Sequence, residues 1–163
     1  MKKIQYPYLP EGREIMYVGL DNKFMKEAHM VAQKYRGSLR QPNGVVLVKD
    51  GVIIGRGSIG MGYHFEHGCE RIKHNMPTGI GYDLCPGCHT DNHGEAQAIR
   101  NAKENDHDTK GADLYLWGHW WYCQHCWDKM IKAGIRDVYL LKNSEILFNK
   151  EHPDNIIGHS LNE

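Results

Sequence analysis

The sequence has no long apolar run, no net charge and no basic stretch. No segment approaches the roughly 18 consecutive apolar residues of a membrane-spanning helix. Twenty lysines and arginines balance twenty aspartates and glutamates, and no run of basic residues is longer than Lys2-Lys3. Such a chain is not expected to present a broad basic surface to a nucleic-acid backbone. We therefore expect no membrane interaction and no extended nucleic-acid interface, although a local basic pocket stays open.

The first residues also lack the features of a signal peptide. MKKIQYPYLPEG has prolines and tyrosines where a signal peptide has about 7 to 15 apolar residues. A cytoplasmic protein is therefore expected, in which thiols stay reduced and a Cys-x-x-Cys pair indicates metal binding or catalysis more often than a disulfide. Two such pairs, CPGC and CQHC, account for four of the five cysteines. The length of 163 residues predicts a single domain over residues 1–163.

The hydrophobic pattern predicts a mixed α/β fold. Asp50-Gly51 separates two β-branched runs, which is typical of an antiparallel hairpin within residues 44–57. Apolar residues at helical spacing predict helices over residues 22–36, 93–105 and 123–134. Short apolar runs predict two further strands, at residues 112–118 and 136–142. Because one helix joins these last two strands, we expect them to be parallel, with a right-handed crossover.

Residues 58–92 form a long glycine-rich segment without any sustained hydrophobic period. A segment of this kind inside a compact domain is usually functional, or is held by something other than a core. It contains Cys69, Cys85 and Cys88 as well as several histidines. The residues after 142 are polar and weakly patterned.

His93-Gly-Glu95 and Cys123-Gln-His-Cys126 each begin a predicted helix. A helix N-terminus favours anionic ligands and lowers the pKa of a thiol. Cys123 and Cys126 lie on the same side of one helical turn, and His93 could supply a third ligand. Three protein ligands leave the fourth tetrahedral position for water, which is typical of catalytic zinc. Glu95 is placed to carry protons rather than to bind the metal.

The order of these motifs resembles a known family. His93-x-Glu95 followed by Cys123-x-x-Cys126, in a chain of hairpin, helix, strand, helix and strand, resembles the zinc-dependent cytidine/deoxycytidylate deaminase superfamily over about residues 24–142. The resemblance implies a three-layer α/β/α fold around a mixed sheet, with residues 58–92 as an insert. The stretch CERIKHNMPTGIGYDLCPGCHTDNHGE is most similar to the deoxycytidylate deaminase branch, which carries a cysteine-bearing insert and often binds a second zinc there.

The resemblance implies a hydrolytic deaminase that converts dCMP to dUMP and releases ammonia. Zinc held by His93, Cys123 and Cys126 would activate a water for attack on the base. Glu95 would carry the water proton to the ring nitrogen and then help protonate the departing ammonia. Cytidine, guanine, a pterin or an RNA base are alternative substrates for the same fold. Deaminases of this kind commonly associate as dimers or hexamers, so a homo-oligomer is expected.

Several residues beside the motifs are candidates for contact with substrate. Asn43, just before the hairpin, is either a hydrogen-bonding partner of the substrate or a turn residue. Trp120 and Trp121 lie in the loop before the CQHC motif, where an indole can stack on a base or pack as a lid. A phosphate on the substrate would need a cation, and the candidates are Arg40, Arg71 and Lys73.

The chain departs from the family pattern at three places. Tyr122 precedes Cys123 where the family has proline, and Gly94 follows His93 where alanine is usual. The connection between the strand at 112–118 and Cys123 is about two residues longer than is typical, and bulky indoles fill it. None of these changes affects a predicted zinc ligand, so they concern the substrate pocket more than the chemistry.

Cys69, Cys85 and Cys88 are the cysteines left over; they are either ligands of a second, structural zinc that holds the insert together or reduced free thiols in a loop, and we expect the zinc. Its fourth ligand stays open among His64, His67, His74 and His89. A rival hypothesis joins CPGC and CQHC in one four-cysteine zinc site, as in a zinc-ribbon binding module without enzymatic activity. That hypothesis leaves His93-Gly-Glu95 without a role.

Overall fold

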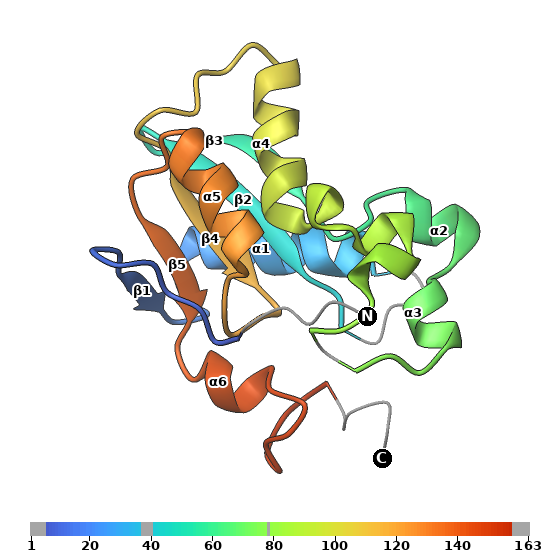
Figure 1. Cartoon of the computed structure of the whole chain (residues 1–163). Helices are drawn as coiled ribbons and strands as arrows, with labels where there is room; N and C mark the ends of the chain where they lie inside the picture. The colour runs from blue at the N-terminus through green and yellow to red at the C-terminus, as the bar shows by residue number, and fades with distance from the viewer. Residues whose placement is uncertain (1–5, 37–40, 78, 158–163) are drawn as a thin grey trace.

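The computed structural model describes residues 6–36, 41–77 and 79–157, and Figure 1 shows the course of the chain. The strands are β1 (Ile15–Val18), β2 (Gly44–Lys49), β3 (Val52–Gly57), β4 (Asp113–Trp117) and β5 (Val138–Leu141). The helices are α1 (Lys23–Lys34), α2 (Tyr63–His67), α3 (Glu70–Lys73), α4 (Gly94–Glu104), α5 (Gln124–Lys132) and α6 (Ser144–Leu147). Three 3-10 turns precede α4, at Tyr82–Leu84, Pro86–Cys88 and Thr90–Asn92.

The strands form one mixed sheet in the order β1-β5-β4-β2-β3. β4 and β5 are parallel, as predicted for strands joined by a helix, and β2 and β3 form the predicted antiparallel hairpin. Asp50 and Gly51 both have positive φ, at 51° and 77°, which is the geometry of a type I′ turn. The sequence-based expectation of a mixed α/β sheet is therefore confirmed.

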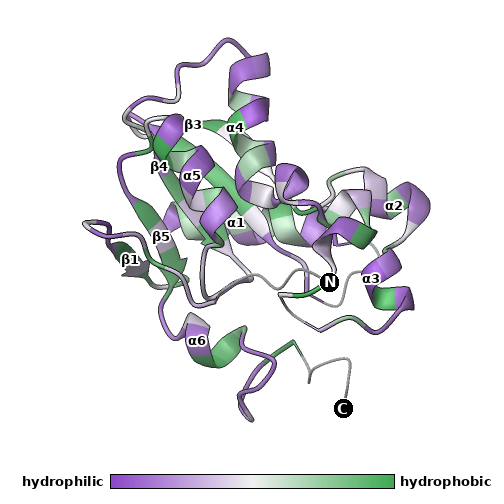
Figure 2. Ribbon diagram, in the orientation of Figure 1, coloured by the Kyte–Doolittle hydropathy of each residue, from purple (hydrophilic) through white to green (hydrophobic). Residues whose placement is uncertain are grey.

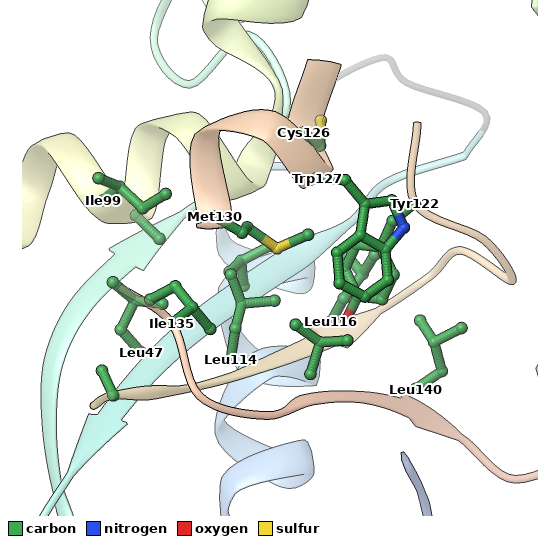
Figure 3. Packing of buried hydrophobic residues seen from close by; sticks show 14 of the residues in the cluster. Leu47, Ile99, Leu114, Leu116, Tyr122, Cys126, Trp127, Met130, Ile135 and Leu140 are labelled. Atoms are coloured by element: carbon green, nitrogen blue, oxygen red, sulfur yellow. The ribbon is translucent and has the colours of Figure 1, made fainter. Parts of the chain in front are cut away.

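Helices cover both faces of the sheet, which confirms the three-layer arrangement (Figure 1). Side chains alternate along β2, so that Val46 and Val48 pack with α1 while Val45 and Leu47 pack with α4 and α5. The hydropathy pattern in Figure 2 follows this division, with apolar strands between helices that turn polar residues outward. Figure 3 shows the core under α5, where Trp127 is completely buried.

Four helices and strands of the described residues were not predicted from the sequence, namely β1, α2, α3 and α6. β1 is only four residues long, and it pairs parallel with β5 at the edge of the sheet with Met16 and Tyr17 exposed. The segment 58–92 contains the short helices α2 and α3 instead of being wholly irregular. α6 lies in the part of the chain that showed little pattern. Among the residues described, no helix has the length and apolar character needed to cross a membrane.

Helix α4 lies unusually close to strand β3, because the strand has glycines where the two elements meet. A Cβ atom added to Gly57 would lie 2.3 Å from the Gly94 carbonyl oxygen and 2.4 Å from the Ala98 nitrogen. A Cβ atom on Gly55 would likewise lie 2.4 Å from the Ala98 carbonyl oxygen. Both contacts are with helix backbone, which cannot rotate away as a side chain can. The position of the α4 N-terminus therefore depends on these two glycines.

A methyl group at position 57 should force α4 away from the sheet. We expect Gly57→Ala to lower the free energy of unfolding by about 1–3 kcal/mol, the range typical of overpacking. Urea denaturation would measure the change, with Val52→Ala on the same strand as the control. Val52 is 59% exposed, so its truncation should alter stability by no more than about 0.5 kcal/mol. Equal stability of the two variants would contradict the close-packing argument.

Candidate active site and metal centres

Three of the predicted ligands meet where two helices begin; we call His93, Cys123 and Cys126 the pocket cluster. His93 directly precedes α4, and Cys123 directly precedes α5, whose first turn contains Cys126. His93 Nδ1 lies 3.3 Å from Cys126 Sγ and 3.7 Å from Cys123 Sγ, and the two sulfurs are 3.0 Å apart. All three side chains are buried. One nitrogen and two sulfurs at this spacing fit a tetrahedral zinc with its fourth position left for water.

The pocket cluster favours a thiolate, which is the form of cysteine that binds metal. The neighbouring Cys126 thiol lowers the pKa of Cys123 to about 4, against the opposite effect of burial, and His93 lowers it further. The starts of α4 and α5 add partial positive charge at the same place. A divalent cation would therefore meet a ligand that is already ionised.

Glu95 lies in the first turn of α4 and is 5% exposed. It lines a pocket together with His93 and Cys123. Burial raises the pKa of the Glu95 carboxyl, while the nearby His93 acts in the opposite direction. A carboxyl held in such a balance, next to the position left for water, is suited to take up and release a proton.

Asn43 lies on the wall of the same pocket, just before β2. Its Oδ1 accepts a hydrogen bond of 2.8 Å from the Ile59 N–H, and its backbone carbonyl accepts one of 2.7 Å from the Ser58 hydroxyl. These bonds fix the side chain and engage its oxygen. The amide nitrogen is then the group that Asn43 can offer to a ligand in the pocket.

The two tryptophans of the loop before α5 have different surroundings. Trp121 lines the pocket and is 4% exposed, with one ring face stacked on Tyr6 at a centroid distance of 5.1 Å. Trp120 does not line this pocket; it borders an adjacent hollow with Phe148. Of the two, Trp121 is thus the one in a position to contact a ligand beside the pocket cluster.

Three further residues on the pocket wall, Ile59, His119 and Tyr82, were missed from the sequence. His119 lines the pocket, and burial lowers its pKa to about 3, so the imidazole is neutral near pH 7. Tyr82 also lines the pocket, with its ring at a centroid distance of 5.3 Å from the His93 ring and nearly perpendicular to it. A histidine in an otherwise aromatic loop beside the ligands is a signal that could have identified His119. No feature of the sequence singles out Tyr82.

The insert holds a second group of ligands, His64, Cys69, Cys85 and Cys88, which we call the clamp cluster. The His64 Nε2 atom lies 3.3 Å from Cys85 Sγ and 3.5 Å from Cys88 Sγ, and Cys69 Sγ lies 3.4 Å from Cys88 Sγ. All four residues are buried, and their ligand atoms lie within 4.8 Å of one another. Four protein ligands close a tetrahedral site, as in structural zinc.

This arrangement answers two questions that the sequence left open. His64 lies with the three cysteines, whereas the side chains of His67, His74 and His89 are at least half exposed. The CPGC and CQHC pairs belong to different clusters, so the hypothesis of a single four-cysteine site is wrong. The physical reason is that the CPGC pair folds back on the insert, where it meets His64 and Cys69. The CQHC pair instead meets His93, which lies at the start of α4 after the insert has ended.

Two of the three basic residues considered for phosphate binding, Arg71 and Lys73, are not among the residues that line the pocket. The Arg71 guanidinium donates to the carbonyls of Pro77 and Ile80 and lies over the Tyr82 ring. Lys73 is exposed and pairs with Glu70. Arg40 lies outside the described residues. The structure therefore gives Arg71 and Lys73 other partners.

The chain thus has a mixed β-sheet between two layers of helices, and it carries two clusters of His and Cys ligands that suit zinc. These features define the class of zinc-binding α/β proteins. The family model described as the cytidine and deoxycytidylate deaminase zinc-binding region matches residues 19–142. The chain therefore belongs to this family of zinc-binding deaminases, as the resemblance of its motifs had indicated. No curated protein sequence is significantly similar to it.

Solved structures of several deaminases are similar to the chain. A dCMP deaminase from the cyanophage S-TIM5, in complex with dCMP and dUMP, is 19% identical with a TM-score of 0.55, over 77% of this chain and 85% of that one. This likeness shows a common fold. A guanine deaminase from Bacillus subtilis is 23% identical (TM-score 0.47; 74% and 62% covered). A diaminohydroxyphosphoribosylaminopyrimidine deaminase/5-amino-6-(5-phosphoribosylamino)uracil reductase from Thermotoga maritima is 28% identical (TM-score 0.43), and 72% of this chain covers only 28% of that one.

The two clusters should bind two metal ions independently enough to be removed one at a time. With zinc in excess, we expect two zinc ions per chain in the wild-type protein and one in either Cys85→Ser or Cys123→Ser. Each substitution removes a thiolate from a different cluster. Elemental analysis after gel filtration would measure the metal content. Loss of the same single zinc in both variants would contradict the division into two clusters.

Proposed function

We propose that the chain is a zinc-dependent hydrolytic deaminase of a nucleobase in a nucleotide or nucleoside, and that it converts dCMP to dUMP. The observation that carries this proposal is the buried Glu95 beside the pocket cluster, in a pocket that Asn43 and Trp121 also line. The reaction replaces the exocyclic amine of the base by an oxygen from water and releases ammonia. Family membership supports the reaction type, and the pocket supports the assignment of residues.

The proposed roles follow from position. Zinc bound by His93, Cys123 and Cys126 would supply Lewis-acid activation of water. Glu95 takes one proton from the water and delivers it to the ring nitrogen next to the amine-bearing carbon. It then passes the second proton, from the newly formed hydroxyl group, to the amine, which leaves as ammonia. Because Glu95 is buried, the proton is passed between the carboxyl and the substrate rather than lost to solvent.

We assign recognition of the base to the other residues that line the pocket. The Asn43 amide nitrogen is suited to donate to an oxygen of the substrate, since its oxygen is engaged by Ile59. Trp121 offers an indole edge or face to a planar ring. The neutral His119 can either donate or accept a hydrogen bond without placing a charge beside the metal. Such a wall suits a flat, uncharged heterocycle.

The choice of dCMP rests on two comparisons. The cysteine-bearing insert resembles that of deoxycytidylate deaminases, and its ligands gather in the clamp cluster. The cyanophage protein with the same fold is a dCMP deaminase solved with dCMP and dUMP. Cytidine, guanine, a pterin and an adenosine-bearing RNA are the alternative substrates, because the family model covers several kinds of deaminase.

Ammonia release from a panel of compounds tests the proposal. The panel contains dCMP, CMP, deoxycytidine, cytidine, guanine, a pterin and an adenosine-bearing RNA, each incubated with zinc-loaded protein. We expect the highest kcat/KM with dCMP and conversion to dUMP. Preference for another compound would overturn the substrate assignment, and no ammonia from any of them would overturn the deaminase proposal for this panel.

Replacing the proposed proton carrier should separate catalysis from metal binding. We expect Glu95→Gln to lower kcat by about 100- to 10,000-fold, the usual contribution of general acid–base catalysis, with the zinc content unchanged. The control is Glu104→Gln, an exposed carboxylate at the other end of α4. A Glu95→Gln protein that kept full activity would exclude the proton-transfer role.

The two tryptophans provide a matched pair for substrate binding. Trp121 lines the pocket while Trp120 borders the adjacent hollow, so only the first should contact a base. Stacking of a base on an aromatic ring contributes about 1–3 kcal/mol, and we therefore expect Trp121→Leu to raise KM about 5- to 150-fold. Trp120→Leu should change KM much less. Steady-state kinetics on the best substrate, with metal content as a check on the site, would compare them.

A further inference from the structure

Cys88 connects the clamp cluster and the pocket cluster through two different atoms. Its side chain belongs to the clamp cluster, with Sγ 3.4 Å from Cys69 Sγ and 3.5 Å from His64 Nε2. Its backbone carbonyl oxygen lies 3.0 Å from Nε2 of His93, which is a member of the pocket cluster. The two clusters are therefore joined through one residue.

The contact between Cys88 and His93 determines which nitrogen of the imidazole can bind a metal. A carbonyl oxygen can only accept a hydrogen bond, so His93 Nε2 must carry the proton and donate it. The lone pair is then on Nδ1, the atom that faces the sulfurs of Cys126 and Cys123 at 3.3 and 3.7 Å. A hydrogen bond of this kind fixes the tautomer and the ring orientation of a metal-binding histidine.

The backbone of Cys88 lies in a short turn that begins and ends at clamp residues, Cys85 and Cys88. Apart from its cysteines, the apolar cluster of the insert contains only partly buried residues, namely Ile59, Tyr63 and Ile72. So little apolar burial is a weak source of order. Within the turn, the Cys88 N–H donates to the Cys85 carbonyl at 2.9 Å. A metal bound to both of these cysteines would therefore fix the turn that carries the Cys88 carbonyl.

The insert reaches His93 from a second side as well. The Tyr82 ring and the His93 imidazole form a T-shaped pair, and the Arg71 guanidinium lies 4.2 Å from the centroid of the Tyr82 ring. Arg71 in turn donates to the Ile80 carbonyl at 3.0 Å and to the Pro77 carbonyl at 2.8 Å. His93 is thus held between two parts of the insert, which both depend on the folding of residues 58–92.

We propose that metal binding at the clamp cluster strengthens metal binding at the pocket cluster, because the clamp fixes the Cys88 carbonyl that orients His93. Cys88 is accordingly a positioning residue for the site, through its backbone, in addition to a clamp ligand through its sulfur. The inference rests on the ligand assignments of the proposed function, and it does not depend on the identity of the substrate.

The test measures the affinity of each cluster for Co²⁺. In the wild-type protein the absorption bands distinguish the three-sulfur clamp cluster from the two-sulfur pocket cluster, and in Cys69→Ser the signal of the pocket cluster is identified by its loss in Cys69→Ser/Cys123→Ser. Cys69→Ser removes one clamp ligand and leaves the pocket cluster and Cys88 in place. We expect it to weaken Co²⁺ binding at the pocket cluster about 10- to 100-fold, the usual effect of losing the partner that orients a ligand. The control is His74→Ala, an exposed histidine of the insert outside both clusters, which should change neither affinity.

Cys123→Ser is the reverse variant. It leaves every clamp ligand in place, so a change in its metal binding cannot be caused by misfolding of the insert. Coupling between two binding equilibria is reciprocal, so Cys123→Ser should weaken Co²⁺ binding at the clamp by the same factor. Unchanged pocket affinity in Cys69→Ser, or unchanged clamp affinity in Cys123→Ser, would overturn the proposal.

Nitrogen-15 NMR of the histidines provides a readout that does not involve activity. In Cys123→Ser loaded with one equivalent of zinc, we expect a slowly exchanging His93 Nε2–H that is lost when a chelator removes the zinc. An Nε2–H signal insensitive to the chelator would contradict control by the clamp. Coupled metal binding in a protein that releases no ammonia would overturn the proposed function alone, so the two failures are distinguishable.

Discussion

The close approach of helix α4 to strand β3 determines where the whole site lies. Gly55 and Gly57 allow the helix backbone to rest on the strand, and a Cβ atom at either position would lie within 2.4 Å of helix backbone. The same helix begins with His93 and Glu95, so the depth at which it packs sets the depth of the ligand and of the carboxylate. Gly94 also permits close packing, because a Cβ atom there would lie 2.9 Å from the Val45 side chain. The glycine found where the family usually has alanine thus brings the start of α4 against β2.

A second constraint comes from the chain between the two clusters. Only four residues separate Cys88, a clamp residue, from His93, a pocket residue. A short connection of this kind cannot move one end without moving the other, and the carbonyl–imidazole hydrogen bond removes the freedom that is left. A glycine-rich segment with little apolar burial can therefore support a buried site when its own cysteines are tied together. With a metal bound, the insert would be ordered by its His and Cys ligands more than by apolar burial.

The elements with strong local signals were predictable from the sequence, and those that depend on tertiary contacts were not. Asp50-Gly51 and the helical spacing around Trp127 located the hairpin and α5, because turn geometry and amphipathic periodicity are local properties. The short-range spacing of His93 and Glu95, and of Cys123 and Cys126, likewise predicted residues that the structure brings together. The choice of His64 over three other histidines could not be predicted, since ligand spacing in an irregular segment is unconstrained until the chain path is known. Edge strands and pocket walls could not be predicted for the same reason. β1 pairs with the distant β5, and Tyr82 lies on the pocket wall in contact with Arg71 and His93, which its own sequence neighbourhood does not indicate.

The departure from the family at position 122 shows how one kind of constraint can replace another. A proline before Cys123 would restrict the backbone of the loop directly. Tyr122 instead is completely buried, packs its ring against Trp127 and donates a hydrogen bond of 2.8 Å to the Tyr139 carbonyl on β5. The loop is therefore anchored to the sheet by a side chain rather than by a fixed φ. Because this anchor is at its very end, the longer loop can place Trp121 and His119 on the pocket wall without disturbing Cys123.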